Sequence, residues 1–500
     1  MFVTLRHMHQ PAGNRLRHSK LAGIAILTIS FAAVLSTVGC GNQYRPVVSS
    51  IGPVGPAGQP EKFAVAISNP TATNSLGLAT IVDFAGDTVL TTPQVLANPS
   101  YFQVNANGSQ GFVIDPQGSL NTFPISPSVL TSNVVQTTLP VGASPVSITS
   151  FAPASALLTI FIPLATPRTV AALNAGTAAL YDTVGIQGTG TPVYVVGATG
   201  TPRVYAISQN GTTGLGQVDA IETVSTTSLS DSAQIPVGVD PVYGVMTPDD
   251  RRAFILNPAS GTVTVLNVPS NALDTLPPAT TSSGPGTIPL CSSPAGGNAP
   301  CPTNNPVWAD LNTVNTQLVV LNKGDGIHGG SLSVINIPLC SPAAQPSNPN
   351  CSSTNPVDAA GFGQILATVP VGINPTMVSV LQGTDTNAPA AYVINQVDST
   401  GTCTDKNSGT VTVINLQTNQ VAATICGVSG SEATADANGT SNVIFGHPNS
   451  VSATGGAPTG KVYITSSDNT YMSVLYTNTN TVQTHLPLQG NGLRVLVTQP

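Results

Sequence analysis

The sequence predicts an all-β fold built from one repeated, four-stranded unit. The first observation is a recurring step in which a polar residue is followed by proline and then by a β-rich run. The step occurs at Asn98-Pro99, Ser144-Pro145, Thr191-Pro192, Asp240-Pro241, Asn305-Pro306, Asn374-Pro375 and His447-Pro448. These ladder prolines lie 46, 47, 49, 65, 69 and 73 residues apart. Such near-regular spacing is typical of a repeat architecture.

Composition gives the second observation. Hydrophobic residues make up 41% of the chain and charged residues only 7%. The abundant Val, Ile and Thr suit pleated strands, whereas Gly, Asn and Pro supply turns. The helix-favouring residues Lys, Glu, Arg and Met are scarce. A chain of 500 residues is too long for one ordinary core, so we expect a repeat array or several domains.

The third observation is the content of each unit, which is clearest from Pro236 onward. The run PVGVDPVYGV is followed by the strand RAFILNP at 252–258, a tight turn at Ser260-Gly261 and the strand TVTVLNV. Each unit thus offers about four short strands, as one blade of a propeller does. Copies stacked around an axis bury the faces that a single sheet leaves open. The sequence therefore predicts a closed β-propeller over 62–500.

The number of blades follows from the ladder. Each ladder proline begins one unit, and residues 62–96 supply one more unit that lacks its first strand. The C-terminal run LRVLVTQ is a strand left over. If it pairs with the N-terminal blade, the ring closes with eight blades; seven blades is the alternative.

The units resemble the YVTN β-propeller repeat, whose pattern runs roughly PVG-x-x-P, YVxN, SGTVSVID and TIPVG. The matching residues are Pro370-Val371-Gly372 with Pro375, Tyr392-Val393-Ile394-Asn395, 408–415 (SGTVTVIN) and Ala423-Thr424-Ile425. The match is good over 240–488 and loose over 62–235. The resemblance implies a propeller, and related propellers include lactonases, lyases and quinone-dependent dehydrogenases with sites at the central channel. It implies no particular function, because propellers host many activities.

The N-terminus has the pattern of an export signal. Four basic residues precede an apolar run from Leu21 to Val38, with no acidic residue before position 40. The end of the run, LSTVGC at 35–40, resembles a bacterial lipoprotein lipobox, which implies cleavage before Cys40 and lipid attachment there. We expect a signal peptide at 1–39, then an anchor and Pro/Gly-rich tether at 40–61. Ordinary cleavage and an uncleaved transmembrane helix are the alternatives.

Charge excludes one class of partner. After cleavage the chain would hold ten Lys and Arg against 21 Asp and Glu, a net charge of −11. Nucleic-acid binding depends on clustered Lys and Arg, and the mature chain has no basic run. We therefore expect no nucleic-acid partner.

The remaining cysteines fit an exported protein. Six is an even number, and an oxidising envelope permits disulfides. Pairing of neighbours would join Cys291 to Cys301, Cys340 to Cys351 and Cys403 to Cys426, with other connectivities open. These cysteines fall in the longest intervals, so we expect disulfide-pinned loop insertions over about 280–430. A zinc site is the weaker interpretation, since no CxxC pair or nearby histidine completes one.

Polar clusters outside the repeat are interpreted as turns and loops. We expect a turn role for His447 and a widened hairpin for 323–330, and His328 and His485 complete no metal motif. The stretch 398–407 is predicted to be a disulfide-clipped loop rather than a calcium site, and the charged cluster 249–252 a solvated turn. We expect Trp308 to pack between blades, with the channel mouth as the alternative.

No catalytic motif stands out, and no metal or cofactor is predicted. The sequence lacks a G-x-S-x-G that follows a strand and opens a helix. We predict a monomeric, lipid-anchored envelope propeller that binds protein or polysaccharide, exported to the periplasm or outer surface. A propeller enzyme is one alternative, because a channel site built from several blades leaves no local motif. A structural surface-layer component is the other.

Overall fold

The computed structural model describes residues 62–498, apart from 72–74, 154–156, 212–213, 226, 277–284, 293–297, 300–303, 315, 338–360, 384–387, 400 and 430–441. The chain divides into two compact units, 1–61 and 62–500, and the described residues all belong to the second. Among them, no helix is long and apolar enough to cross a membrane. The described helical elements are the short 3-10 helices η2 (Thr131–Asn133) and η3 (Pro258–Ser260).

The described residues form an all-β fold of antiparallel sheets. The second sheet consists of β4 (Tyr101–Val104), β5 (Gln110–Ile114), β6 (Ser119–Pro124) and β7 (Val135–Thr138). The third consists of β8 (Thr149–Phe151), β9 (Thr159–Leu164), β10 (Thr169–Asn174) and β11 (Leu180–Gly185). The fourth consists of β12 (Thr191–Val196), β13 (Arg203–Gln209), β14 (Leu215–Ser225) and β15 (Ser228–Val239). The fifth comprises β16 (Tyr243–Met246), β17 (Arg252–Asn257), β18 (Thr262–Asn267), β19 (Ala272–Leu273) and β20 (Thr287–Pro289). A two-stranded ribbon, β21 (Cys291–Ser292) with β22 (Asn298–Ala299), follows it.

A continuous sheet of eight strands comes next. It runs through β23 (Pro306–Asn312), β24 (Gln317–Asn322), β25 (Gly329–Asn336), β26 (Ile365–Leu381), β27 (Ala390–Val397), β28 (Thr410–Asn415), β29 (Gln420–Val428) and β30 (Ile444–Phe445). The 17-residue strand β26 serves two partners. Its first half pairs with β25 (Val369 opposite Leu332), and its second half pairs with β27 (Val378 opposite Val393). Two four-stranded repeats therefore share one long strand.

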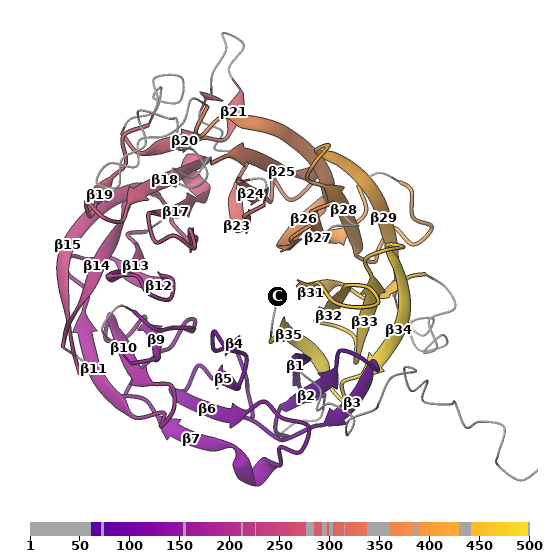
Figure 1. Cartoon of the computed structure of the whole chain (residues 1–500), viewed down its shortest axis with the longest axis horizontal. Coiled ribbons are helices and arrows are strands. Elements are labelled where there is room, and N and C mark those ends of the chain that lie inside the picture. The colour runs from indigo at the N-terminus through magenta and orange to yellow at the C-terminus, as the bar shows by residue number, and fades with distance from the viewer. Residues whose placement is uncertain are drawn as a thin grey trace, which may run out of the picture. The chain divides into compact units, whose positions relative to one another are not determined.

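The last sheet is β31 (Pro448–Thr454), β32 (Lys461–Ser466), β33 (Tyr471–Tyr476) and β34 (Thr481–Pro487). The first sheet combines both ends of the unit. Strand β1 (Phe63–Asn69) pairs on one edge with β2 (Leu78–Asp83) and on the other edge with β35 (Asn491–Val497). Strand β2 also pairs with β3 (Thr88–Thr91). In Figure 1 the sheets of this unit succeed one another around a common centre, with β4, β12, β23, β31 and β35 near it and β7, β15, β29 and β34 at the outside.

The hydrophobic core lies between neighbouring sheets. Phe102 of β4 packs in one cluster with Val65 of β1 and Ile81 of β2. Ala64 of β1 packs in another with Tyr463 of β32, so the first sheet contacts the last as well as the second. Because each sheet buries both faces against its neighbours, its middle strands are apolar on both sides, as the sequence FAVAISN of β1 shows.

Four of the ladder prolines lie at or near the start of an inner strand segment and pack on a glycine of the preceding repeat. A Cβ atom at Gly409 would lie 2.0 Å from Cδ of Pro448, so only glycine lets the two backbones approach this closely. The same contact recurs in other sheets. The pairs are Gly77 with Pro99, Gly216 with Pro241, Gly330 with Pro375, and Gly409 with Pro448. The ladder thus marks an interlocking contact from sheet to sheet.

The residues around each ladder proline have special backbone geometry. The preceding residues Asp240, Asn305 and Asn374 have φ angles of 60°, 52° and 51°, a left-handed conformation that Asn and Asp tolerate better than other side chains. Register shifts follow at Pro192/Tyr194, Pro306/Trp308, Pro375/Met377 and Pro448/Ser450. A bulge of this kind re-aims the next side chain. In these sheets the re-aimed side chain is the one two residues after the proline.

The asparagine that resembles the last letter of YVxN is a structural residue. Asn395 is fully buried, and its side-chain amide donates to the hydroxyls of Thr410 and Thr412 at 3.1 Å on the next strand. Asn257 and Asn322 donate in the same way to Thr264 and Ser333, at 2.9 Å. This motif therefore fixes the pairing of the second and third strands and supplies no group to a site.

Candidate functional site: a central cluster of aromatic residues and one arginine

The functional candidate lies where the inner strands converge. Residues two positions after the ladder prolines come from different strands but meet near the centre. We call four of them, together with Arg494 of β35, the central cluster: Tyr101, Tyr194, Tyr243, Trp308 and Arg494. Each is half-buried, so each is held by the fold and still offers surface to a ligand.

The aromatic rings of the central cluster form a continuous stack. The Tyr243 and Trp308 ring centroids are 4.1 Å apart with an interplanar angle of 17°, and Tyr194 lies 4.7 Å from Tyr243. Contacts at these distances contribute beyond the area they bury. The three rings belong to β12, β16 and β23 in three different sheets, and the Tyr194 ring is tilted by 43° to that of Tyr243. The packing of these sheets therefore holds a preorganised aromatic surface.

Arg494 extends the stack with a positive charge. Its guanidinium lies 4.3 Å from the Tyr101 ring centroid and 5.4 Å from that of Trp308, in range for cation–π attraction to both. It has no carboxylate partner among the described residues. Among the described residues, the recorded partners of this charge are the two aromatic faces.

Two cavities adjoin the central cluster. The large central cavity, of about 300 Å³, is lined by Tyr194 and Tyr243 and by residues such as Gln103, Thr149 and Asp310. The small central cavity, of about 110 Å³, is lined by Tyr101, Trp308 and Arg494 with Ser100, Thr376, Met377, Asn449, Ser450 and Leu493. Flat aromatic faces beside a few polar groups are typical of small-ligand sites.

Electrostatics keep the hydroxyl groups of the large cavity neutral. Burial raises the pKa of Tyr194 and Tyr243 well above the ordinary tyrosine value, while the charge of Arg494 opposes the rise. Both hydroxyls therefore remain protonated at any physiological pH and can donate hydrogen bonds. Burial also raises the pKa of Asp310 to about 6, against the opposing effect of backbone N–H groups from Val380 and Leu311, each 2.8 Å from a carboxylate oxygen.

Trp308 is a site residue for which the sequence analysis favoured packing between blades and gave the channel mouth only as the alternative. The favoured prediction of packing between blades is incomplete, because the indole stacks on Tyr243 and lines the small central cavity. The other members of the central cluster were not predicted. Aligning the residues that lie two positions after each ladder proline would have identified Tyr101, Tyr194 and Tyr243. Arg494 belongs to β35, which carries no ladder proline.

None of the three histidines in the described residues, His328, His447 and His485, belongs to the central cluster. Nδ1 of His447 lies 2.6 Å from Asp468, and Nδ1 of His328 lies 2.6 Å from Asp325 within the hairpin between β24 and β25. His485 is buried with its ring 3.7 Å from that of Phe445. Within the described ranges, no group of three or more His, Cys, Asp or Glu side chains is placed to hold a metal ion.

The prediction that the charged cluster 249–252 is a solvated turn is wrong at its last residue. Arg252 is fully buried, and its Nε donates to Asp274 at 2.6 Å while its guanidinium lies 4.4 Å from the Phe362 ring centroid. Asp249 and Asp250 do lie in a turn. Arg252 differs because it is the first residue of β17, where the side chain enters the contact between two sheets.

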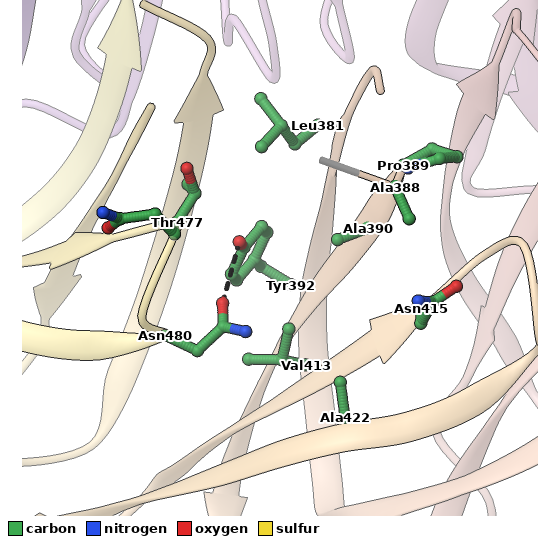
Figure 2. A pocket seen from close by; sticks show the side chains of 11 residues that line it. Leu381, Ala388, Pro389, Ala390, Tyr392, Val413, Asn415, Ala422, Thr477 and Asn480 are labelled. Carbon is green, nitrogen blue, oxygen red and sulfur yellow. Dashed lines mark hydrogen bonds between the residues drawn. The ribbon is translucent and has the colours of Figure 1, made fainter. Parts of the chain in front are cut away.

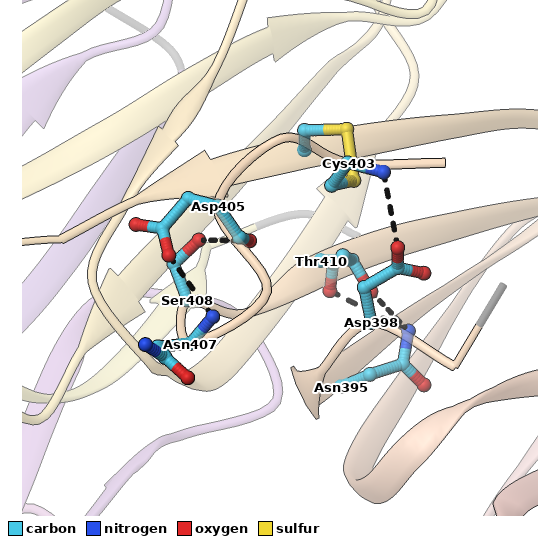
Figure 3. The surroundings of a disulfide bond; sticks show 8 residues. Asn395, Asp398, Cys403, Asp405, Asn407, Ser408 and Thr410 are labelled. Carbon is cyan, nitrogen blue, oxygen red and sulfur yellow. Dashed lines mark hydrogen bonds between the residues drawn. A yellow bond between two sulfur atoms is a disulfide. The ribbon is translucent and has the colours of Figure 1, made fainter. Parts of the chain in front are cut away.

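The Cys403–Cys426 disulfide is confirmed (Figure 3). Asp398 accepts the Cys403 N–H at 3.0 Å, and Asp405 accepts the hydroxyl of Ser429 at 2.7 Å, so the stretch 398–407 is a clipped loop as expected. Cys291 is disulfide-bonded. The positions of Cys40, Cys301, Cys340 and Cys351 lie outside the described residues, so the pairings of Cys291 with Cys301 and of Cys340 with Cys351 stay predictions.

A further cavity of about 170 Å³ lies at the outer contact of two sheets (Figure 2). The Tyr392 hydroxyl donates to Oδ1 of Asn480 at 3.1 Å across it. Its lining contains no charged side chain: Leu381, Ala388, Pro389, Ala390, Tyr392, Val413, Asn415, Ala422, Thr477, Asn478 and Asn480. The central cavities are the stronger candidate, because they combine aromatic faces with a cation and a carboxyl group.

Comparison with known proteins supports the fold. No family model and no curated protein sequence matches the chain. Among solved structures, the chain is similar to the dihydro-heme d1 dehydrogenase NirN in complex with DHE, with a TM-score of 0.54 and 13% identity over 88% of this chain and 75% of that one. It is also similar to apo AztD from Citrobacter koseri, with a TM-score of 0.52 and 10% identity over 87% of this chain and 96% of that one.

A putative 6-phosphogluconolactonase from Bacteroides fragilis matches with a TM-score of 0.46 and 11% identity over 89% of this chain and 99% of that one. A TM-score this low supports no inference about function. These neighbours are β-propeller proteins. At such low identity, the similarity shows that this chain has a propeller-like all-β fold and shows the fold alone.

Proposed function

We propose that this protein is a lipid-anchored β-propeller of the bacterial cell envelope that binds glycans at the large central cavity. The observation that carries the proposal is the preorganised stack of Tyr194, Tyr243 and Trp308 beside that cavity. Sugar rings present a flat C–H face that packs on aromatic rings and a rim of hydroxyls that needs hydrogen-bond partners. Gln103, Thr149 and Asp310 offer such partners in the same cavity.

The propeller would be monomeric, closed and eight-bladed. Its count rests on the division of β26 between two blades and on the pairing of β35 with β1. With these two assignments each blade has at least four strands, and the YVTN-like motifs fall at equivalent places. Closure matters for function because it brings Arg494 beside Tyr101 of the second sheet.

Membrane attachment is tested at Cys40, the proposed lipidation site. Cys40→Ser is expected to move the protein from the membrane fraction to the soluble fraction of its native host, because the lipobox pattern places the acyl chains on that thiol. Immunoblots of fractionated cells, with Cys291→Ser as a control for general loss of stability, provide the measurement. Unchanged membrane association of Cys40→Ser would refute lipid anchoring.

Glycan binding is tested through Trp308, the only tryptophan of the chain. A panel of neutral and acidic oligosaccharides from bacterial envelopes is expected to include one that shifts the intrinsic fluorescence saturably. Calorimetry on Tyr194→Ala should then show binding at least tenfold weaker, because one face of the stack is lost. Tyr181→Ala, on the outer strand β11, is the matched control and should bind normally. The proposal fails if no member of the panel binds at millimolar concentration.

An enzymatic role is the second candidate, favoured by Asp310. A carboxyl group with a pKa of about 6 can both accept and release a proton near neutral pH, as a general acid–base group must. Turnover of any oligosaccharide that binds, abolished in Asp310→Asn while calorimetry still detects binding to that variant, would select this role over simple binding.

A further inference from the structure

The small central cavity holds an arginine whose hydrogen-bonding capacity is not used by the fold. The Nε of Arg494 is buried and has no hydrogen-bond partner among the described residues. The Nε of Arg203 is also unpartnered, but its guanidinium pairs with Glu222 at 2.9 Å. The fully buried Arg252 and Lys461 each have a carboxylate partner as well. Arg252 lies 2.6 Å from Asp274, and Lys461 lies 2.8 Å from Asp87. A buried guanidinium N–H without an acceptor is costly, so a ligand atom that accepts its hydrogen bond would stabilise the site.

A second unused polar group faces the same cavity. The Thr376 hydroxyl is buried without a hydrogen-bond partner, whereas the neighbouring polar side chains are satisfied. Ser100 donates to the Ile114 carbonyl oxygen, and Asn449 donates to that of Gly492. The Ser450 hydroxyl accepts the Val495 N–H at 3.1 Å. Arg494 and Thr376 are thus left as two donors around one space of about 110 Å³.

The chemistry of these donors selects the group that would bind. Aromatic rings contact the guanidinium through Tyr101 and Trp308, which leaves its edge for a ligand. The edge of a guanidinium matches the two oxygens of a carboxylate. No carboxylate of the described residues pairs with Arg494. Asp310, which lines the large cavity, accepts backbone N–H groups on both oxygens.

We infer that the glycan carries a carboxylate and that Arg494 and Thr376 bind it, so that the ligand is a uronate-containing oligosaccharide. The inference rests on the proposed function, which supplies the sugar. The small cavity has room for a carboxylate and the carbon atoms beside it. The sugar ring would then contact Trp308, which joins this cavity to the aromatic stack. Arg494 and Thr376 would determine specificity for the acidic sugar.

The test compares a trigalacturonate with its methyl ester, which has the same rings and no charge. Calorimetry and Trp308 fluorescence are expected to show at least tenfold tighter binding of the acid to the wild-type protein. Arg494→Gln should remove this preference. Arg494→Lys should keep part of it, because lysine supplies the positive charge but not the bidentate hydrogen bonds of a guanidinium. Thr376→Val should weaken acid binding threefold or more and leave ester binding unchanged. Arg203→Gln, at an arginine paired with Glu222, is the matched control.

The possible outcomes separate this inference from the proposed function. Equal binding of acid and ester would overturn the carboxylate assignment and leave glycan binding in place. Binding of neither trigalacturonate form nor of any other panel member would remove the proposed function itself. Sulfate that displaces the acid more strongly than acetate does would show a site for tetrahedral anions, and the carboxylate assignment would be wrong. Thr376→Val keeps the test valid if substitutions at Arg494, on the closing strand, impair folding.

Discussion

A chain that ends at Gln489 is expected to lose its single cooperative unfolding transition and to aggregate. The deletion removes β35, whose backbone pairs with β1 from Asn491 to Val497. It also removes hydrogen bonds to the last sheet, where Ser450 and Ser452 accept the N–H groups of Val495 and Val497. Strand β1 is apolar, and an exposed apolar edge strand is a template for aggregation.

The measurement is thermal unfolding by circular dichroism together with size-exclusion chromatography. A chain that ends at Thr498 is the matched control, since it keeps every described strand. A synthetic peptide of sequence NGLRVLVT added to the truncated protein should restore part of the transition, because the missing strand can pair in trans. A truncated chain that unfolds at the wild-type temperature as a monomer would show that β35 does not hold the two ends of the unit together.

The strands could be predicted from the sequence because local residue patterns determine them. Four of the ladder prolines pack on glycines, and both residue types are uncommon enough inside strands to be noticed in the sequence. The leftover C-terminal run was predicted to pair with the first sheet, and β35 does pair with β1. The pairing of Cys403 with Cys426 was predicted because they are neighbouring cysteines along the chain, and the structure contains this disulfide.

The central cluster escaped prediction because no local pattern contains it. Its members are separated by up to about 390 residues, and the shared position after the ladder proline holds different residue types, such as Tyr in β12 and Met in β26. In the sequence, Arg494 is a single charged residue in the C-terminal strand, and no neighbouring motif marks it as functional. The function of such residues depends on convergence in space, which a repeat predicts only once its register around the axis is known.

A pair of buried carboxyl groups is expected to make the protein less stable as the pH rises. Asp219 of β14 is fully buried and accepts the Gln217 side-chain amide at 2.9 and 3.1 Å. Asp231 of β15 is close enough to form a hydrogen bond with it, and both oxygens of Asp231 are buried. Two carboxylates this close cannot both ionise cheaply, so the pair holds one proton between them.

Burial is the main cause that raises the pKa of both groups, and that of Asp219 reaches about 7. In the unfolded chain the pKa of an aspartate is about 4. Between these values the folded protein binds a proton that the unfolded chain has lost. The contribution to stability is therefore complete below pH ~4 and is lost as the pH rises through about 7. Each pKa unit corresponds to about 1.4 kcal/mol, so the loss is on the order of a few kcal/mol.

Urea unfolding at pH 5 and at pH 8 measures this loss. Asp231→Asn is expected to flatten the difference between the two values, because its amide donates a hydrogen bond to Asp219 and removes the like charge. Asp249→Asn, at a turn carboxyl group that lies 3.9 Å from Arg251, is the matched control and should keep the wild-type difference. A wild-type protein equally stable at both pH values would mean that both carboxyl groups ionise in the folded state. The large sheet contact between β14 and β15 would then have to admit water to them, since only solvent or a counter-ion could stabilise two charges there.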